Sequence, residues 1–257
     1  MPIVLTDDEW DEQRATLVPR IEEVFASDKS ISELASEIGS IVEEYPTSAC
    51  TEALVSAIVN ANHSNPAKAD PIIQALVPHV AAWQAIDIDW AGSRGTFYDV
   101  FSVDLLELLK TILFETQLHQ PKRTKVEATN LTLSTALLSA AIIKHGLFKA
   151  VHVPYGFAYD ALKLPGYGSS KSRSEVLAVG ACLQLSTAGK LMMEKNLEQV
   201  FGKEKIVNAL KALKENGTIK HPLGLDLLDH TIENAEADFP RSYSAGDAWA
   251  KVFPPSN

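Results

Sequence analysis

The chain has 257 residues, of which 46% are hydrophobic and 22% are charged. This composition is typical of a globular protein that buries a substantial core. The first residues lack the basic start and apolar run of a signal peptide, and no segment reaches the roughly 18 uninterrupted apolar residues of a membrane span. We therefore expect a soluble cytoplasmic protein with no membrane partner, forming one helical domain over 1–257.

The net charge of −10 is unevenly distributed along the chain. Residues 1–118 hold 6 basic and 20 acidic side chains (net −14), residues 119–220 hold 15 and 7 (net +8), and residues 221–257 hold 2 and 6 (net −4). A basic section between acidic ones can steer an acidic partner or a nucleic acid to one side of the molecule. It can equally allow two parts of the same molecule to attract each other.

The first predicted helix covers residues 6–26. Thr6 stands at its cap, Glu9 follows three residues later, and acids fill the first turn. The acid-rich segment DDEWDE would place its carboxylates on the solvent side of this helix start, so we do not expect it to bind a metal.

Three more helices are expected before the first loop. Residues 31–45 follow a cap at Ser30 or Ser32 and stop at Pro46, and Thr47 caps a helix that runs to residue 62. A fourth helix, 71–85, should bend at Pro78. The first two of these form a helical hairpin, because their connection is very short.

Residues 86–96, IDIDWAGSRGT, form the first clear loop. Their alternating acids do not meet the calcium-loop consensus, so we expect a loop rimmed with acids. An apolar helix over 97–118 follows. The charged linker 119–127 is then the best candidate for a sub-boundary, because charge sign, polarity and proline content all change there.

The second half is organised around the stretch 172–194. Its apolar residues recur at separations of three, four and seven, with small residues between them, which predicts a central helix buried against several neighbours. Before it we expect a helix over 128–145, another over 148–164 bent at Pro154, and a surface loop at 165–173. After it come helices at 203–216 and 223–237, then a tail that we expect to be irregular.

This reading gives about nine helices and no period-two strand. Helices joined by short loops predict an all-α fold, with antiparallel helical hairpins in an α-solenoid (HEAT-like) or an irregular bundle. No clean repeated signature identifies a strict repeat family.

Sequence motifs for common chemistry are absent. The chain has no GxSxG, GxxxxGK[ST], GxGxxG after a strand, or HExxH. His145 and His152 could approach each other across the turn at Gly146, but no carboxylate has ligand-like spacing to that pair. Cys50 and Cys182 each lie in an apolar helical pattern, which predicts buried free thiols. We expect no metal and no cofactor, and we favour a non-enzymatic chain, while an enzyme with a noncontiguous site stays open.

Three stretches within about 131–239 carry a resemblance: IIKHGLF at 142–148, YDALKL at 159–164 and CLQLSTAGKLM at 182–192. Their order is similar to the later part of the helical-repeat middle domain of eukaryotic initiation factor 4 gamma. That family usually has an aromatic and a Gly-Glu pair before the first turn, whereas this chain has Ser139, Ala140 and Ala141. The resemblance implies a translation-linked scaffold that docks a helicase or another protein and touches RNA through a basic surface.

Three functional hypotheses follow, of which the last is a helical protein whose charge blocks mediate only its own assembly. The first is a non-enzymatic scaffold whose basic section binds an acidic protein surface, or RNA. Lys190 is the polar position matched in the resemblance, and the other candidate partner-binding residues come from charge alone: Lys144, Lys149, Lys195, Lys203, Lys205 and Lys211. The overall acidity of the chain makes RNA the less favoured partner. The alternative is a small-molecule-binding protein or enzyme with a pocket formed by His145, His152, Tyr155, Phe157 and Tyr159.

Overall fold

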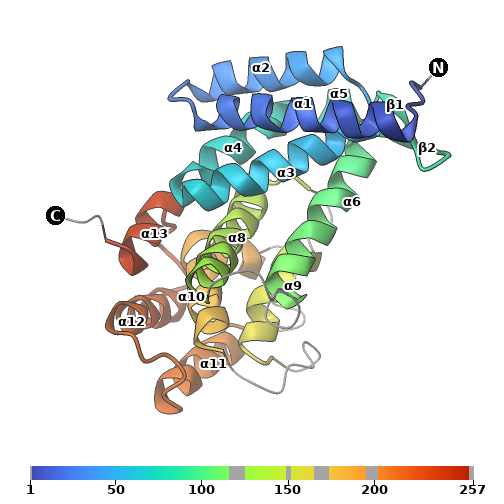
Figure 1. Ribbon diagram of the computed structural model, residues 1–257. Helices are drawn as coiled ribbons and strands as arrows, with labels where there is room; N and C mark the ends of the chain where they lie inside the picture. The colour runs from blue at the N-terminus through green and yellow to red at the C-terminus, as the bar shows by residue number, and fades with distance from the viewer. Residues whose placement is uncertain (1, 116–124, 149–151, 165–173, 195–201, 255–257) are drawn as a thin grey trace. The chain divides into compact units, whose positions relative to one another are not determined.

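The computed structural model describes residues 2–115, 125–148, 152–164, 174–194 and 202–254. These residues are mostly helical and include one two-stranded sheet, which confirms the all-α fold class (Figure 1). The chain divides into two compact units, unit 1 (Met1–Leu108) and unit 2 (Leu109–Asn257). The division falls inside helix α6 (Phe97–Lys110), upstream of the sub-boundary predicted at 119–127. Residues 119–124 of that linker lie outside the described residues.

Unit 1 begins with three helices whose starts follow the predicted caps. They are α1 (Asp7–Ala26), α2 (Ile31–Glu44) and α3 (Ser48–Ser64). Thr6 and Ser30 each form a capping box with a glutamate three residues later, and the Thr47 hydroxyl accepts from the Cys50 N–H. These caps satisfy amide groups that a helix start leaves unpaired, so the local sequence fixes where each helix begins.

Helices α1 and α3 pack side by side and run in the same direction (Figure 1). The Thr47 hydroxyl donates to Gln13 Oε1 at 2.5 Å near their beginnings, and Asn60 Nδ2 donates to Glu22 Oε1 at 2.7 Å near their ends. The residue numbers of these contacts increase in the same direction along both helices, so the two helices are parallel. Fully buried apolar residues fill the interior of the unit, among them Leu17, Ile21, Ile38, Leu54 and Ile58.

The segment after α3 is broken into short pieces, as its prolines predict. The pieces are η1 (Pro66–Lys68), α4 (Ala69–Leu76), η2 (Val77–His79) and α5 (Val80–Trp83). Trp83 ends this run and is 2% exposed. Its ring lies 5.2 Å from that of Phe97 and 5.4 Å from that of Phe101, so the first turns of α6 are held by aromatic packing.

The loop predicted at 86–96 is instead a β-hairpin, and that prediction was wrong. Strand β1 (Asp87–Trp90) pairs antiparallel with β2 (Ser93–Thr96). The two turn residues, Ala91 and Gly92, have φ angles of 50° and 78°, as two-residue hairpin turns require. Ile88 is completely buried while Asp87 is exposed, so the alternating side chains of this segment are those of a half-buried strand.

The described part of unit 2 contains the π-helical turn η3 (Thr111–Glu115) and six further helices. These are α8 (Lys125–His145), α9 (His152–Ala161), α10 (Glu175–Met192), α11 (Lys203–Glu215), α12 (Pro222–Glu236) and α13 (Ala245–Val252). Within α8, Val126–His145 is long and apolar enough to cross a membrane, with a mean hydropathy of 1.4. Of its most apolar window, 72% is buried inside the protein, as in the core helix of a globular fold.

Helix α10 is the centre of unit 2, which confirms the buried central helix predicted from the sequence. It packs against α8, α9, α12 and α13. Close approach depends on its glycines: a Cβ at Gly180 would lie 3.0 Å from the Phe157 ring, and one at Gly189 would lie 2.5 Å from the Phe239 ring. Phe239 therefore fills the space that Gly189 leaves open.

The tail is ordered as helix α13, so the expectation of an irregular tail was wrong. The Ser244 side chain caps α13 by accepting from the Asp247 N–H. Just before this helix, the Ser242 hydroxyl donates to the carbonyl of Thr187 at 2.6 Å, and the Tyr243 N–H donates to that of Ser186 at 3.0 Å. These bonds tie the tail to α10, and both acceptors are carbonyls of the central helix.

Candidate functional site

The lysines predicted to bind a partner lie in unit 2. Two of them on α11, Lys203 and Lys211, form ion pairs, as does Lys214 of the same helix. The ion pairs are Lys203 with Asp238 (2.9 Å), Lys211 with Glu236 (2.6 Å) and Lys214 with Asp229 (2.6 Å). The side chains in these pairs are exposed, so each pair contributes only about 0–1 kcal/mol to stability. Their main effect is to neutralise charge on the face of α11. Attraction between parts of the same molecule, one of the two interpretations of the charge pattern, is present here.

Three of the remaining predicted lysines lie among the described residues. Lys144 donates to the Tyr243 carbonyl at 3.3 Å and is partly buried. Lys190 lies 3.9 Å from Glu194, one turn away on α10 and its extension, and Lys205 is exposed on α11. Lys149 and Lys195 lie outside the described residues.

The predicted aromatic pocket falls partly in the core of unit 2. Phe157 is 1% exposed and packs with Leu113, Ala136 and Leu177, while Tyr159 is completely buried. His145 ends α8 and is half-buried. His152 and Tyr155 lie in the first half of α9, and their side chains are outside the described residues. The two aromatic side chains that are described are thus packing residues.

A pocket that the sequence analysis did not predict lies in unit 1. We call it the acidic pocket; its volume is about 410 Å³. It is lined by Ile3, Leu5, Asp7, Trp10, Ser48, Glu52, Asp89, Trp90, Ala91, Gly92 and Asp104. The lining combines four carboxylates with two indole rings, and none of these described lining residues is basic.

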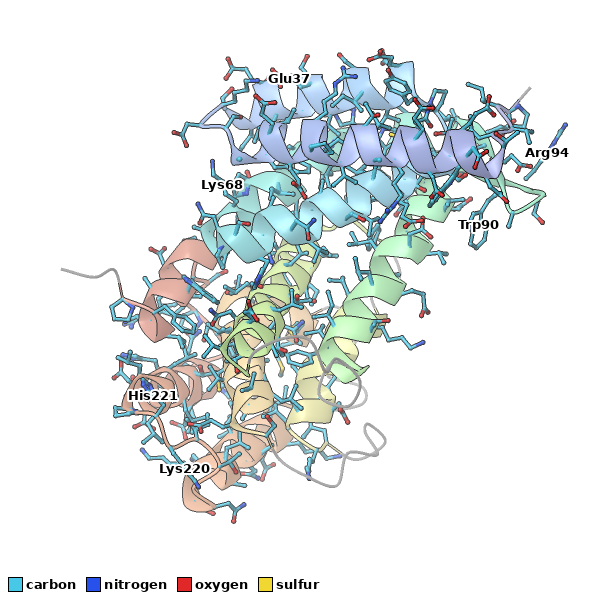
Figure 2. All side chains as sticks on the ribbon, viewed as in Figure 1. Glu37, Lys68, Trp90, Arg94, Lys220 and His221 are labelled. Carbon is cyan, nitrogen blue, oxygen red and sulfur yellow. The ribbon has the colours of Figure 1, made fainter. Side chains whose placement is uncertain are left out.

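Four elements bring these residues together. The start of α1 supplies Asp7 and Trp10, and the hairpin supplies Asp89 and Trp90. Helices α3 and α6 supply Ser48, Glu52 and Asp104, and Ile3 and Leu5 come from the segment before α1. Trp90 forms the last cross-strand pair before the turn and is 42% exposed, and Figure 2 shows it projecting from the hairpin. The hairpin is therefore needed to place a second indole near the first.

The hairpin turn also orients the carboxylate of Asp89. The N–H of Gly92 donates to Asp89 Oδ2 at 3.4 Å across the turn. Arg94 is directly opposite Asp89 in the strand register, but Figure 2 shows its side chain extending outward from the hairpin. Asp89 thus lies at the pocket without the Arg94 guanidinium in it.

The charge of the pocket is only partly compensated. Arg14 Nε lies 2.8 Å from Glu52 Oε1, and its guanidinium lies 5.9 Å from the centre of the Trp10 ring. This contact pairs one of the four carboxylates and leaves a net negative lining. It also places a cation over one of the two indoles, which is the geometry of a cation–π contact.

Asp104 is a half-buried carboxyl of the pocket. Burial raises its pKa above the ordinary value of 3.8; a hydrogen bond from the Thr51 hydroxyl (3.1 Å) opposes this shift, and the charge of Glu52 adds to it. Ionisation of Asp104 therefore lowers the stability of the free protein, and a cation bound next to it would reduce this loss.

The carboxylates of the pocket are not grouped as metal ligands. Among the described residues, no group of three or more His, Cys, Asp and Glu side chains is arranged to hold a metal ion. Carboxylates and indole rings in one lining suit an organic cation, such as an ammonium or guanidinium group.

The chain matches no protein-family model, no curated protein and no solved structure. The assignment of the site therefore depends on its own geometry.

The two segments that form most of the pocket were visible in the sequence, but separately. DDEWDE and DIDWAG each contain carboxylates next to a tryptophan, and each was interpreted as an exposed acidic stretch. The alternation of Asp87, Ile88, Asp89 and Trp90 was the available sign of a strand. Contact between the two segments depends on tertiary packing, which no local pattern encodes.

Proposed function

We propose that this chain is a non-enzymatic helical scaffold and that its acidic pocket receives a lysine or arginine side chain of a protein partner. The observation that carries the proposal is the combination, in one pocket of about 410 Å³, of two tryptophans and four carboxylates. Indole faces attract cations through the ring quadrupole, and carboxylates pair with ammonium and guanidinium groups. The proposal keeps the scaffold class predicted from the sequence and changes the expected charge of the partner.

The charge of the pocket also argues against RNA at this position. Nucleic-acid binding depends on basic side chains that neutralise phosphates. A lining of four carboxylates repels phosphate, so RNA would have to bind elsewhere. Binding of an acidic protein or of RNA by the lysines of unit 2 stays a prediction. Three lysines of α11 already have acidic neighbours within the chain.

The proposal is tested by selecting peptides on the full-length chain from a random twelve-residue display library. We expect the enriched peptides to share a lysine or arginine at one position. Replacing that residue by alanine should raise the Kd about tenfold or more, which corresponds to about 1.4 kcal/mol for one cation in an aromatic, acidic pocket.

The pocket is then tested with matched variants. Trp90→Ala and Asp89→Asn should weaken the selected peptide, whereas Asp87→Asn should bind it as the wild type does. Asp87 is the control because it lies on the same strand, is exposed and does not line the pocket. Enrichment of acidic peptides, or equal effects of Asp87→Asn and Asp89→Asn, would contradict the proposal. Binding of free alkylamines with the affinity of the peptide would instead favour a small-molecule site.

A further inference from the structure

The hairpin of unit 1 leaves one edge of strand β1 without a strand partner. Among the described residues, β1 pairs with β2 alone, in a sheet of two strands. An edge of this kind presents N–H and C=O groups on which another chain can pair. The hydrogen-bond register of the hairpin determines which residues of β1 supply these groups.

Alternate residues of β1 bond to β2. In an antiparallel pair, residues that exchange hydrogen bonds with the facing strand alternate with residues whose N–H and C=O groups point away from it. Trp90 and Ser93 flank the two-residue turn, so they form a hydrogen-bonded pair. The Phe97 N–H donates to the Ile86 carbonyl at 2.8 Å, four positions from Trp90, as the same alternation requires. The even-numbered residues of β1 therefore face β2 with their backbone groups.

The free backbone groups belong to Asp87 and Asp89, the odd-numbered residues of β1. Their N–H and C=O groups point away from β2, and among the described residues no backbone hydrogen bond uses them. The segment 2–5, which contributes Ile3 and Leu5 to the acidic pocket, forms no backbone hydrogen bond with β1. This edge of β1 is therefore available for pairing.

The acidic pocket lies along the same edge. Asp89 and Trp90 are consecutive residues of a strand, so their side chains point to opposite faces of the hairpin, yet both line the pocket. Ala91 and Gly92 of the turn also line it, but none of the described residues of β2 does. A cavity that borders both faces of β1 and does not border β2 lies beside the edge of β1. The free backbone groups and the carboxylates are thus parts of one site.

Taking the proposed function as its premise, we infer that the partner binds as an added antiparallel strand on the free edge of β1 and places its lysine or arginine opposite Asp89. Side chains directly opposite each other on neighbouring strands lie about 4.5–5.5 Å apart at their Cβ atoms. The basic side chain then enters the acidic pocket beside the Asp89 carboxylate, while its own N–H and C=O groups pair with those of Asp89. Asp87 contributes its main chain to the next pair.

The charge of this edge selects the occupant. Asp87 and Asp89 both carry a carboxylate, and none of the described residues that line the adjoining pocket is basic. A strand with a basic residue complements this edge, whereas an acidic strand is repelled. A bound helix could not use the free groups of β1, because its own N–H and C=O groups are bonded within the helix.

N-methylation of the peptide from the display selection, one residue at a time, tests the main-chain pairing. Each N-methyl group removes one N–H donor and leaves the side chain unchanged. N-methylation of the basic residue, and of the residue two positions away that faces Asp87, should raise the Kd at least about tenfold, since each loses a hydrogen bond and adds a methyl group against β1. The intervening residues are matched controls, because their N–H groups point away from β1, and their N-methylation should change the Kd less than about twofold.

Asp87→Pro tests the same bonds from the side of the protein. Proline removes the Asp87 N–H, which β2 does not use, so the hairpin should keep its fold. We expect this variant to bind the selected peptide at least about fivefold more weakly than Asp87→Asn, which keeps the N–H. Circular dichroism compares the folding of the two variants.

The results also separate strand addition from the proposed function. Equal effects of N-methylation at bonded and intervening positions, or no effect at either, would overturn strand addition and leave the proposed function standing. Equal binding by folded Asp87→Pro and Asp87→Asn would likewise contradict strand addition. Selected peptides without a shared basic residue would overturn the proposed function, and strand addition with it.

Discussion

In unit 2 three lysines of α11 pair with acids of α12 and of the residues after it, whereas in unit 1 the carboxylates of the acidic pocket are only partly paired, through Arg14. Unit 2 is the more basic part of the sequence and attracted the prediction of a binding surface. Sequence charge alone does not show which charged side chains already have a neighbour of opposite charge in the same chain, and the ion pairs of α11 supply that information.

The units also differ in how their aromatic residues are used. In unit 2 Phe157 and Tyr159 are buried in the core, while in unit 1 Trp90 is 42% exposed at the edge of a pocket. Burial makes an aromatic ring a packing residue, and exposure next to carboxylates makes it available to a cation. The predictions below test this contrast, from the largest expected effect to the smallest.

Phe157→Ala should destabilise unit 2 by about 3–5 kcal/mol, because it leaves a cavity among Leu113, Ala136 and Gly180. Urea unfolding followed by circular dichroism measures the loss. Trp90→Ala, which removes an exposed ring, should change the free energy of unfolding far less. Equal losses for the two variants would mean that the contrast between a packed and an available aromatic residue does not hold.

Gly189→Ala should lower the stability of unit 2 by about 1–3 kcal/mol, since its Cβ would lie 2.5 Å from the buried Phe239 ring. A loss of stability would be informative, because replacing glycine by alanine inside a helix usually raises stability, by up to about 1 kcal/mol. Gly202→Ala is the control, as a Cβ there meets nothing within 4 Å. A Gly189→Ala protein more stable than the wild type would show that Phe239 does not need this space.

One carboxyl in each unit should change the free energy of unfolding with pH, and the two changes should have opposite signs. Burial raises the pKa of Asp104, so its ionised form costs stability, and this cost grows as pH rises above 3.8. For Glu175, burial raises the pKa, but hydrogen bonds from the N–H groups of His221 and Lys220, at 2.7 Å each, outweigh it and leave the pKa below 4.5. The stability from Glu175 is therefore present above pH 4.5 and is lost as pH falls through its folded pKa.

Accordingly, Asp104→Asn should raise the free energy of unfolding at pH 7, and Glu175→Gln should lower it. Both differences from the wild type should shrink toward pH 3, where the native carboxyls become protonated. Urea unfolding at a series of pH values measures both. A stability loss for Asp104→Asn at pH 7 would show that the ionised carboxyl is satisfied in the free protein and does not await a cation.

The smallest effect concerns the ion pairs of α11. A double-mutant cycle of Lys211→Ala and Glu236→Ala should give a coupling of about 0.2–1 kcal/mol, because both side chains are about half exposed. The coupling should decrease in 1 M salt. A coupling of zero at low salt would mean that this charge compensation is absent in solution.

The sequence was most informative where local chemistry decides the structure. Thr6, Ser30 and Thr47 mark three helix starts, Pro78 marks a break, and the spacing around Cys182 marks the buried central helix. Cys50 and Cys182 are buried free thiols, as predicted, and burial raises the pKa of each to about 12.

The sequence was least informative where distant segments meet. The β-hairpin was missed because its strands are only four residues long and its turn uses Ala91 at a positive φ angle, a conformation unusual for alanine. Helix α13 is short and depends on bonds from Ser242 and Tyr243 to α10. The acidic pocket requires four elements to converge, so no single stretch predicts it.

The most direct test of the central claim compares one variant from each unit. The Kd of a selected lysine- or arginine-containing peptide is measured for Asp89→Asn/Asp104→Asn in unit 1 and for Lys203→Glu/Lys205→Glu/Lys211→Glu in unit 2, with circular dichroism as the control for folding. We predict that the unit 1 variant binds at least about tenfold more weakly, while the unit 2 variant binds the peptide as the wild type does. Unchanged binding by the unit 1 variant, with loss in the unit 2 variant, would contradict the assignment of the site to the acidic pocket.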